Sequence, residues 1–347
     1  MAITTAQRVK DLAREAGFDL AGIARVEPGL DWAIYKEWID GGRAGEMRYL
    51  TDHRADIRLD PRRILPSARS IVCVGKRYNG PLPYSTDFDS TERGWISRYA
   101  WGDDYHLLIR QGLAQVAAKL QNKANCRICV DTAPLLERSY ARMAGLGWIG
   151  KNTCLIHEGK GSWFFLGEML TSLELEPDTP PPDRCGTCTR CIDACPTQAI
   201  IPTPGGRYTL DSRLCISYFT IELRGSIPEE NRSGIGQHVF GCDICQDVCP
   251  WNRRAPTDCD AEYRPREFAP PLERLAALTD QEFRAMYRDT PVSRARYRGF
   301  LRNVAVAMGN SRLARFRPAL EKLAAGGDEV VAEHARWALG RLISGNE

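Results

Sequence analysis

Apolar residues recur along the N-terminal half of the chain at spacings that alternate between helix and strand. A spacing of three to four residues predicts a helix over residues 5–16, with Thr5 as its N-cap, and a longer helix over residues 103–121. Residues 70–75 form a short, continuous apolar run, which is typical of a buried strand. The apolar positions are Val9, Leu12 and Ala16 in the first helix, and Ile109, Leu113, Val116 and Leu120 in the second.

The alternation of strands and helices continues to the end of this half. Residues 128–132 are predicted to form a strand that ends at Asp131 and Thr132, and a helix that begins at Pro134 follows. Because strands and helices alternate, we expect one α/β domain over residues 1–176. The elements predicted after residue 132 are a helix over 134–144 and strands over 154–158 and 161–170.

Two further segments follow a proline-rich linker at residues 177–185. The first, residues 177–258, is rich in cysteine. The second, residues 259–347, has helical spacing over 299–309, 313–325 and 328–343, which predicts a small α-helical tail of the helical-repeat kind.

Eight of the 13 cysteines lie in the middle segment at spacings that indicate iron–sulfur clusters. The run C-x2-C-x2-C-x3-C-P is the bacterial ferredoxin spacing, in which the fourth cysteine ligates the other cluster of a pair. A second run, C-x2-C-x3-C-P, and a single cysteine between the runs complete two sets of four. We therefore predict one [4Fe–4S] cluster on Cys185, Cys188, Cys191 and Cys249, and another on Cys195, Cys215, Cys242 and Cys245.

Structural zinc on paired CxxC motifs is the alternative to iron–sulfur clusters. Zinc does not require three thiolates at successive two-residue gaps, so the spacing favours clusters. The other five cysteines have no such pattern, and we expect them to be buried structural thiols. They are Cys73, Cys126, Cys129, Cys154 and Cys259.

Composition excludes several classes of protein. With 347 residues, of which 43% are hydrophobic, the chain is a packed globular protein rather than a disordered one. No apolar run is long enough for a membrane helix, and the N-terminus lacks the apolar region of a secretory signal. We therefore expect a cytoplasmic protein that does not associate with membranes.

The formal net charge of +3 conceals a strongly basic segment. Between Arg284 and Arg317 there are nine arginines and a single acid, Asp289. Tyr287 and Tyr297 lie among these arginines, which favours a nucleic-acid partner over the alternative of a solvated helix face.

Three motifs in the first domain fail as ligand sites. Gly145–Gly150 matches G-x-G-x-x-G, but a helix precedes it and a strand follows, which is the reverse of the dinucleotide-binding order. Lys151 is followed by Asn152, so the sequence is not a P-loop. Asp104-Tyr-His106 begins a cobalamin-binding pattern that requires glycine where Ile109 stands, so we expect His106 to be an ordinary helix residue.

Asp131 is the carboxylate that we retain as a candidate. It ends a predicted strand, where α/β sheets place ligand sites, and Glu137 and Arg138 follow within two turns. The alternative is that Asp131 only caps the helix near Pro134.

Residues 130–152, 185–200, 215–230 and 241–253 strongly resemble the epoxyqueuosine reductase family, and 301–310 resemble its C-terminal region. The resemblance implies a nitroreductase-like cobalamin domain, a ferredoxin-like double-cluster domain and a HEAT-like tail. It also implies reduction of the epoxide of epoxyqueuosine, at the wobble position of tRNAs that read Asp, Asn, His and Tyr codons. This is the last step of queuosine synthesis.

The resemblance also implies roles for particular residues. Asp131 is the implied proton donor, and beside an apolar corrin we expect its pKa to be raised. The implied cobalamin pocket is Arg58, Ser97, Asp131, Arg138, Lys151 and Asn152, with no protein histidine on cobalt. Some relatives carry cysteine where Ser97 stands, so cysteine ligation of cobalt is not available here. We assign tRNA contacts to Arg294, Arg296, Arg298 and Arg302.

Electrons would come from an external low-potential donor such as flavodoxin or ferredoxin. A plain electron-transfer module and a corrinoid reductive dehalogenase are the rival interpretations. The former gives no reason for a corrin or tRNA affinity, and the latter none for a basic tail.

Overall fold

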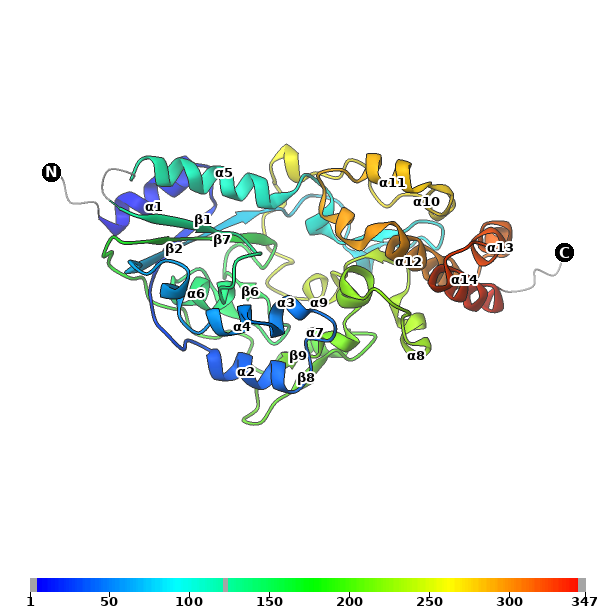
Figure 1. Ribbon diagram of the computed structural model, residues 1–347, viewed down its shortest axis with the longest axis horizontal. Coiled ribbons are helices and arrows are strands. Elements are labelled where there is room, and N and C mark those ends of the chain that lie inside the picture. The colour runs from blue at the N-terminus through cyan, green and yellow to red at the C-terminus, as the bar shows by residue number, and fades with distance from the viewer. Residues whose placement is uncertain (1–4, 121–123, 343–347) are drawn as a thin grey trace.

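The computed structural model describes residues 5–120 and 124–342, which form an elongated molecule with the first and last helices at opposite ends (Figure 1). A four-stranded sheet occupies the N-terminal part, in the order β1-β2-β7-β4, and every neighbouring pair is antiparallel. The mixture of helices and strands is as predicted, whereas the pairing is not the parallel one usual in alternating α/β chains. The strands are β1 (Leu20–Arg25), β2 (Ser70–Arg77), β4 (Cys126–Cys129) and β7 (Phe164–Thr171).

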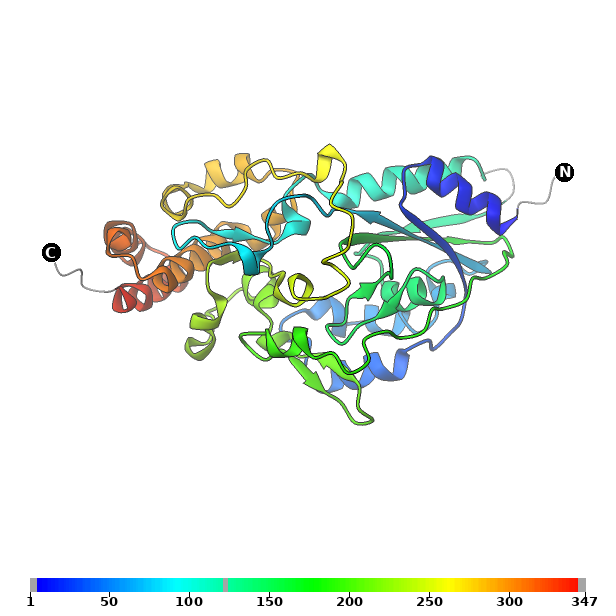
Figure 2. The same ribbon diagram turned by 180° about the vertical axis from the view of Figure 1, so that it is seen from behind.

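Helices cover both faces of this sheet (Figures 1 and 2). Alternate residues of β2 divide between the two faces: Val72 and Val74 pack with helices α1 and α5, and Ile71 and Cys73 pack toward α6. The predicted helices 5–16 and 103–121 are confirmed, although residue 121 lies outside the described residues. The helices are α1 (Ala6–Glu15), α5 (Tyr105–Ala118) and α6 (Glu137–Met143).

The segment after β4 differs from its prediction. The strand ends at Cys129, and Asp131 has a φ of 53°, in the left-handed region that breaks both strand and helix. Helix α6 consequently begins at Glu137, three residues after the predicted start at Pro134. Asp131 therefore neither ends a strand nor caps a helix.

Short helices and strands fill the space below the sheet in Figure 1. Between β1 and β2 the chain forms three short helices, and the predicted strand at 154–158 reduces to two residues that pair with β5. The elements are α2 (Trp32–Asp40), α3 (Arg48–Thr51), α4 (Arg54–Ile57), β5 (Trp148–Ile149) and β6 (Leu155–Ile156).

The cysteine-rich segment folds around short helices and a hairpin. Its last strand, β10, pairs in parallel with β3 from the first predicted domain. A five-residue π-helix spans Tyr218–Glu222. The other elements are β3 (Trp95–Ile96), α7 (Arg190–Asp193), β8 (Ile200–Pro202), β9 (Tyr208–Leu210), α8 (Glu229–Arg232), β10 (His238–Phe240) and α9 (Ile244–Asp247).

The tail is helical, as predicted, and it shares its core with the preceding segments. One hydrophobic cluster contains Trp95 from β3, Phe240 from β10 and Phe300 from α12. No helix among residues 5–120 and 124–342 is long and apolar enough to cross a lipid bilayer. The tail helices are α10 (Leu272–Ala277), α11 (Asp280–Met286), α12 (Arg296–Ser311), α13 (Arg317–Ala324) and α14 (Glu329–Arg341); residue 343 of the predicted last helix lies outside the described residues.

Candidate active site and cluster-binding cysteines

The first predicted set of thiols lines a single cavity of about 200 Å³. Cys249, which comes from the second cysteine run, lies in that cavity with the three cysteines of the first run, Cys185, Cys188 and Cys191. A zinc ion draws four thiolates to one point, whereas a cubane fills a volume between them. The arrangement therefore fits a cluster and matches the pairing predicted from the spacing.

The second set of thiols also comes together. Burial, and then the nearby Cys215 and Cys195, hold the pKa of the Cys242 thiol well above its usual range. Cys245 lies close to Cys242, to Cys215 and to a ninth thiol, Cys154. Of the five cysteines expected to be buried, Cys73 and Cys129 are buried, whereas Cys126, Cys154 and Cys259 are partly exposed.

Two residues assigned to the cobalamin pocket bind the cluster loops. Lys151 Nζ donates to the carbonyl oxygens of Gly186 (2.7 Å) and Cys188 (3.0 Å) in the first loop. Asn152 Nδ2 donates to the carbonyl oxygen of Cys245 (3.2 Å) in the second. These adjacent side chains thus fix the two cluster loops relative to one another.

Ser97 is joined to the second cluster loop by a buried carboxylate. Asp243, between Cys242 and Cys245, accepts hydrogen bonds from Ser97 Oγ (2.5 Å) and from the backbone N–H of Arg98 (2.7 Å). The backbones approach so closely that a Cβ on Gly241, whose φ is 68°, would lie 2.4 Å from the Ser97 Cβ. Glycine is required there for both reasons.

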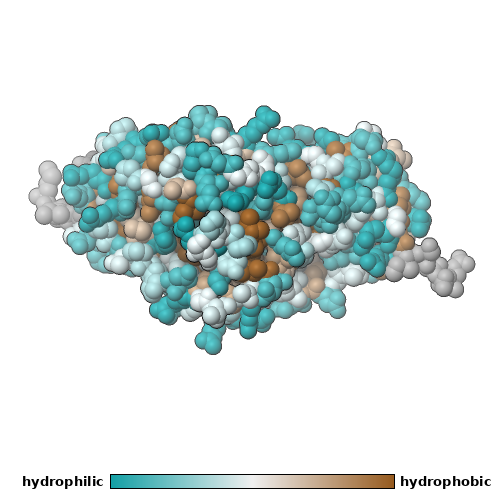
Figure 3. Space-filling view, turned by 90° about the horizontal axis from the view of Figure 1, so that it is seen from below, coloured by the Kyte–Doolittle hydropathy of each residue, from teal (hydrophilic) through white to brown (hydrophobic). Residues whose placement is uncertain are grey.

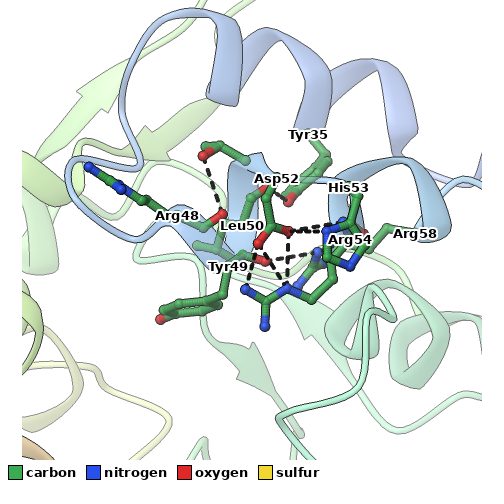
Figure 4. A network of polar contacts seen from close by, with 9 residues as sticks. Tyr35, Arg48, Tyr49, Leu50, Asp52, His53, Arg54 and Arg58 are labelled. Carbon is green, nitrogen blue, oxygen red and sulfur yellow. Dashed lines mark hydrogen bonds and ion pairs between the residues drawn. The ribbon is translucent and has the colours of Figure 1, made fainter.

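Arg58 is buried and binds the protein backbone (Figure 4). Its guanidinium donates to the carbonyl oxygen of Arg54 (2.9 Å) and lies 5.7 Å from the centre of the Tyr35 ring. Tyr35 donates in turn to the carbonyl oxygen of Leu50. Arg58 thus ties the short helices α3 and α4 together.

Asp131 lies at the meeting point of several distant segments. Its Oδ2 is 3.1 Å from His106 Nε2 on α5 and 3.6 Å from Arg294 Nη1, just before α12. Its backbone N–H donates to Glu137 Oε1 at 2.6 Å, which holds the left-handed turn in place. The carboxylate is 39% exposed, so a ligand can reach it.

The protein groups around Asp131 act against the raised pKa that we expect beside a corrin. Burial raises its pKa, but the hydrogen bond from His106 and the charges of Arg294 and Arg138 outweigh burial, so the pKa is lowered. His106 and Arg294 belong to segments far from Asp131 in the sequence, so the motif around Asp131 does not reveal these cations. In this structure Asp131 is ionised near neutral pH.

A pair of acids lies behind Asp131. Glu168 is 0% exposed, and both of its carboxylate oxygens lack a hydrogen-bond donor among the described residues. Burial and the neighbouring Glu137 raise the pKa of Glu168 well above its usual range, so it is protonated. Burial and the charge of Asp131 raise the pKa of Glu137 to about 7.

Arg294 connects Asp131 to the surface of α3. It is 2.9 Å from Glu222 Oε1 at the end of the π-helix, and it donates to the Tyr49 hydroxyl at 3.2 Å. Arg138 donates to the carbonyl oxygen of Thr153 at 2.7 Å, and its charge acts on both Asp131 and Cys154. Asn152, next to Thr153, donates to the carbonyl oxygen of Cys245, so the loop that Arg138 binds also contacts the second cysteine run.

The four arginines assigned to tRNA have different surroundings. Arg294 is part of the Asp131 site, Arg296 is exposed, and Arg298 is exposed and paired with Asp328 at 3.0 Å. Arg302 is only 1% exposed and donates to the carbonyl oxygens of Phe219, Leu223 (2.9 Å) and Gly225 (2.6 Å). The assignment of Arg302 to tRNA is therefore wrong, because its guanidinium is used to fix the backbone around the π-helix.

Five residues of these sites were not predicted from the sequence: His106, Tyr49, Glu168, Glu222 and Asp243. His106 stood in a motif that we set aside, and Asp243 lies inside a CxxC run. Tyr49 and Glu222 have no distinguishing sequence signal.

Comparisons with known proteins agree with this description. The family model described as "Epoxyqueuosine reductase QueG, DUF1730" matches residues 58–132, and that described as "4Fe-4S double cluster binding domain" matches residues 184–252. The epoxyqueuosine reductase of Xanthomonas campestris pv. campestris is 43% identical over 343 residues, covering 96% of this chain and 95% of the relative. The epoxyqueuosine reductase of Escherichia coli (strain K12) is 37% identical over 347 residues, covering 97% of this chain and 89% of the relative.

Solved structures give the same result. A crystal structure of epoxyqueuosine reductase with an epoxyqueuosine-modified tRNA-Tyr stem loop has a TM-score of 0.86 at 30% identity, covering 97% of this chain and 89% of that one. The Bacillus subtilis enzyme, solved with its catalytic aspartate loop swung out of the active site, has a TM-score of 0.85 at 30% identity. The match covers 97% of this chain and 90% of that one. The chain carries a double [4Fe–4S] cluster domain and belongs to the epoxyqueuosine reductase family of oxidoreductases.

Proposed function

We propose that this chain reduces the epoxide of epoxyqueuosine in tRNA to the alkene of queuosine, with Asp131 giving a proton to the epoxide oxygen. The reaction consumes two electrons and two protons and releases water. The observation that carries the role of Asp131 is its position, accessible to a ligand and between two cationic side chains.

The family's cofactor set matches what these residues can hold. Cobalamin, when bound, supplies a reduced cobalt centre for opening the epoxide, and the two clusters supply its electrons one at a time. Asp131 and Arg138 are exposed and suit direct contact with the cofactor or substrate. Arg58, Ser97, Lys151 and Asn152 already bind protein groups, so their role is to fix the surrounding backbone.

Figure 3 shows hydrophobic residues near the middle of the face seen from below, with hydrophilic residues toward both ends. Among the described residues, the large hydrophobic side chains that are exposed are Ile34 and Leu107. Isolated exposed side chains of this kind are normal on a protein surface, so the case for the cofactor site rests on the residues around Asp131.

The chemical need at Asp131 is for an acid. Opening the epoxide leaves negative charge on oxygen, and a positioned acid within hydrogen-bond reach lowers the barrier. Arg294 and His106 favour the anionic form of Asp131 after it has given up its proton. Glu137 keeps the Asp131 backbone in its strained turn, so that the carboxylate remains directed at the site.

The basic residues beside the site suit the tRNA backbone. Arg224 donates to the carbonyl oxygen of Arg294 at 3.1 Å, which places it, Arg294 and Arg296 together. Phosphate contacts by these arginines would hold an anticodon loop while its modified base leaves the stack to reach Asp131. We infer that the substrates are the tRNAs for Asp, Asn, His and Tyr.

The first cluster cavity is the entry point for electrons in this proposal. Three cationic side chains line it: Lys151, Arg184 and Arg190. Cationic groups around a redox site favour an acidic electron-transfer partner, such as a flavodoxin or a ferredoxin.

The test replaces Asp131 by asparagine, which preserves shape but cannot donate a carboxylic proton. With clusters and cobalamin reconstituted anaerobically, we expect Asp131→Asn to lower turnover by about 100-fold or more. Turnover is followed by mass spectrometry of digested tRNA, as the loss of one oxygen from epoxyqueuosine. The matched control is Asp103→Asn, an exposed carboxylate paired with Arg266. Normal turnover of Asp131→Asn, with both cofactors bound, would remove Asp131 from the mechanism.

A further inference from the structure

The motif Asp104-Tyr-His106 acquires a role once the chain is folded. Asp104 is the N-cap of α5, and its Oδ1 accepts the backbone N–H of His106 at 3.0 Å. The same carboxylate lies 2.6 Å from Nδ1 of the His106 ring, and Nε2 of the ring lies 3.1 Å from Asp131 Oδ2. The imidazole is therefore held between two carboxylates.

This geometry fixes the protonation state of His106. Each ring nitrogen faces a carboxylate oxygen, and an ionised carboxylate only accepts hydrogen bonds. Both nitrogens must then carry hydrogen, so the ring is an imidazolium. Burial lowers the pKa of His106, but the two carboxylates outweigh burial and raise it to about 9.

Asp131 needs such a neighbour because its own pKa is lowered, so it is ionised at neutral pH. The other groups that face it do not supply a proton. Arg294, at 3.6 Å, and Arg138 carry guanidinium groups, which do not act as proton donors in proteins. Glu137 accepts the backbone N–H of Asp131 rather than contacting its carboxylate. Tyr105 and Tyr99 are held neutral, mainly by burial, which raises their pKa values well above normal.

We propose that His106 supplies Asp131 with the proton that Asp131 passes to the epoxide oxygen, and that Asp104 positions the imidazole for this transfer. The inference rests on the proposed role of Asp131. First the Nε2–H bond of His106 breaks as an O–H bond forms on the Asp131 carboxylate. That O–H bond then breaks as an O–H bond forms on the epoxide oxygen. His106 is left neutral, and Asp131 is ionised again at the end of the transfer.

Water can return a proton to His106 after each turnover. The His106 side chain is 23% exposed, so water can return a proton to the ring between turnovers. The Tyr105 and His106 rings lie 4.2 Å apart at an interplanar angle of 25°, which limits rotation of the imidazole. The His106 imidazolium, which is the proposed proton source, thus contacts solvent on one side and Asp131 on the other.

The first test measures the imidazole in the complete chain, without substrate, by NMR titration of isotopically labelled histidine. We expect the pKa of His106 to lie near 9 and to fall toward the ordinary value of about 6.5 in Asp131→Asn and in Asp104→Asn. Asparagine is also an effective N-cap, so Asp104→Asn keeps the start of α5 intact. An unshifted His106 in the wild-type chain would overturn the inference, whatever the activity of the variants.

The second test is the pH profile of turnover in His106→Gln, which keeps a hydrogen-bond donor without a titrating proton. We expect a loss of about 10-fold at neutral pH that grows as pH rises, with KM for tRNA unchanged, because Asp131 must then take its proton from water. The control is His53→Gln on the exposed surface. If His106→Gln has the pH profile of the wild-type chain and Asp131→Asn is inactive, His106 is not the proton source but Asp131 remains the proton donor. Activity of Asp131→Asn would refute the proposed function itself.

Discussion

The two cluster sites and the Asp131 site are built in different ways. The eight predicted cluster thiols come from three short segments within one part of the chain, and their spacing predicts the first set of four, which lines one cavity. The Asp131 site draws on segments that are far apart in sequence, from Tyr49 to Arg294. Local spacing therefore predicts metal-binding chemistry, whereas proton chemistry depends on how the chain packs.

The difference is clearest in the charge state of Asp131. An expectation of a raised pKa is reasonable for a carboxyl group near an apolar cofactor. The structure instead brings His106 and Arg294 to that carboxyl group, and the pKa falls. The sign of the shift is a property of the folded neighbourhood and not of the motif.

The largest predicted effect tests which cysteines ligate the first cluster. Replacing Cys249 with serine removes the ligand that the second cysteine run is predicted to supply to the first cluster. We expect the protein to lose about half of its iron and all turnover. The control, Cys259→Ser, changes a thiol outside both sets and should leave iron content unchanged. Full iron in Cys249→Ser would show that the pairing is wrong.

The next prediction concerns Arg302, which joins the tail to the segment between the cysteine runs. Methionine at this position leaves three buried carbonyl oxygens without a donor. We expect the free energy of unfolding to fall by about 3 kcal/mol or more, measured by urea denaturation. Arg298→Met, at an exposed ion pair, should change it by less than about 1 kcal/mol. Equal effects of the two variants would contradict the buried role of Arg302.

The third prediction tests the acids behind Asp131 through the pH dependence of stability. Glu168 has a raised pKa in the folded chain, so the folded state holds its proton to a higher pH than the unfolded state, whose carboxyl group titrates near 4.5. Its contribution is complete below that value and is lost as pH rises, by up to about 1.4 kcal/mol per pH unit.

Glu168→Gln removes this titration, so its stability relative to the wild-type chain should improve steadily as pH increases from 5 to 7. Denaturation at several pH values measures the difference, with the exposed Glu174→Gln as control. A constant difference across this range would mean that Glu168 is ionised in the folded protein.

The smallest predicted effect concerns tRNA affinity. Arg296→Glu should weaken binding of a tRNA anticodon stem loop several-fold and reduce the salt dependence of binding by about one phosphate contact. Arg315→Glu is the comparison, because Arg315 already pairs with Glu92 at 3.0 Å. Equal loss in both variants would indicate a diffuse charge effect rather than contacts beside the Asp131 site.

Particular residues show what the sequence could and could not predict. The long helices and both cysteine sets follow from periodicity and spacing, which are local properties. Arg298 and Arg302 contribute equally to the basic segment, yet one is exposed and the other is buried against backbone carbonyls. His106 lay in an incomplete motif, and only the approach of α5 to the β4–α6 turn gave it a partner. Charge counts and motifs do not contain that tertiary information.

The shared hydrophobic cluster has a consequence for anyone who wishes to dissect the molecule. One residue of the cluster comes from each of the three predicted domains: Trp95, Phe240 and Phe300. All three are buried in the same hydrophobic cluster. A fragment cut at residue 258 would expose that interior to water. The cysteine-rich segment is thus not an independently folding domain, and we do not expect it to work as a separate electron carrier.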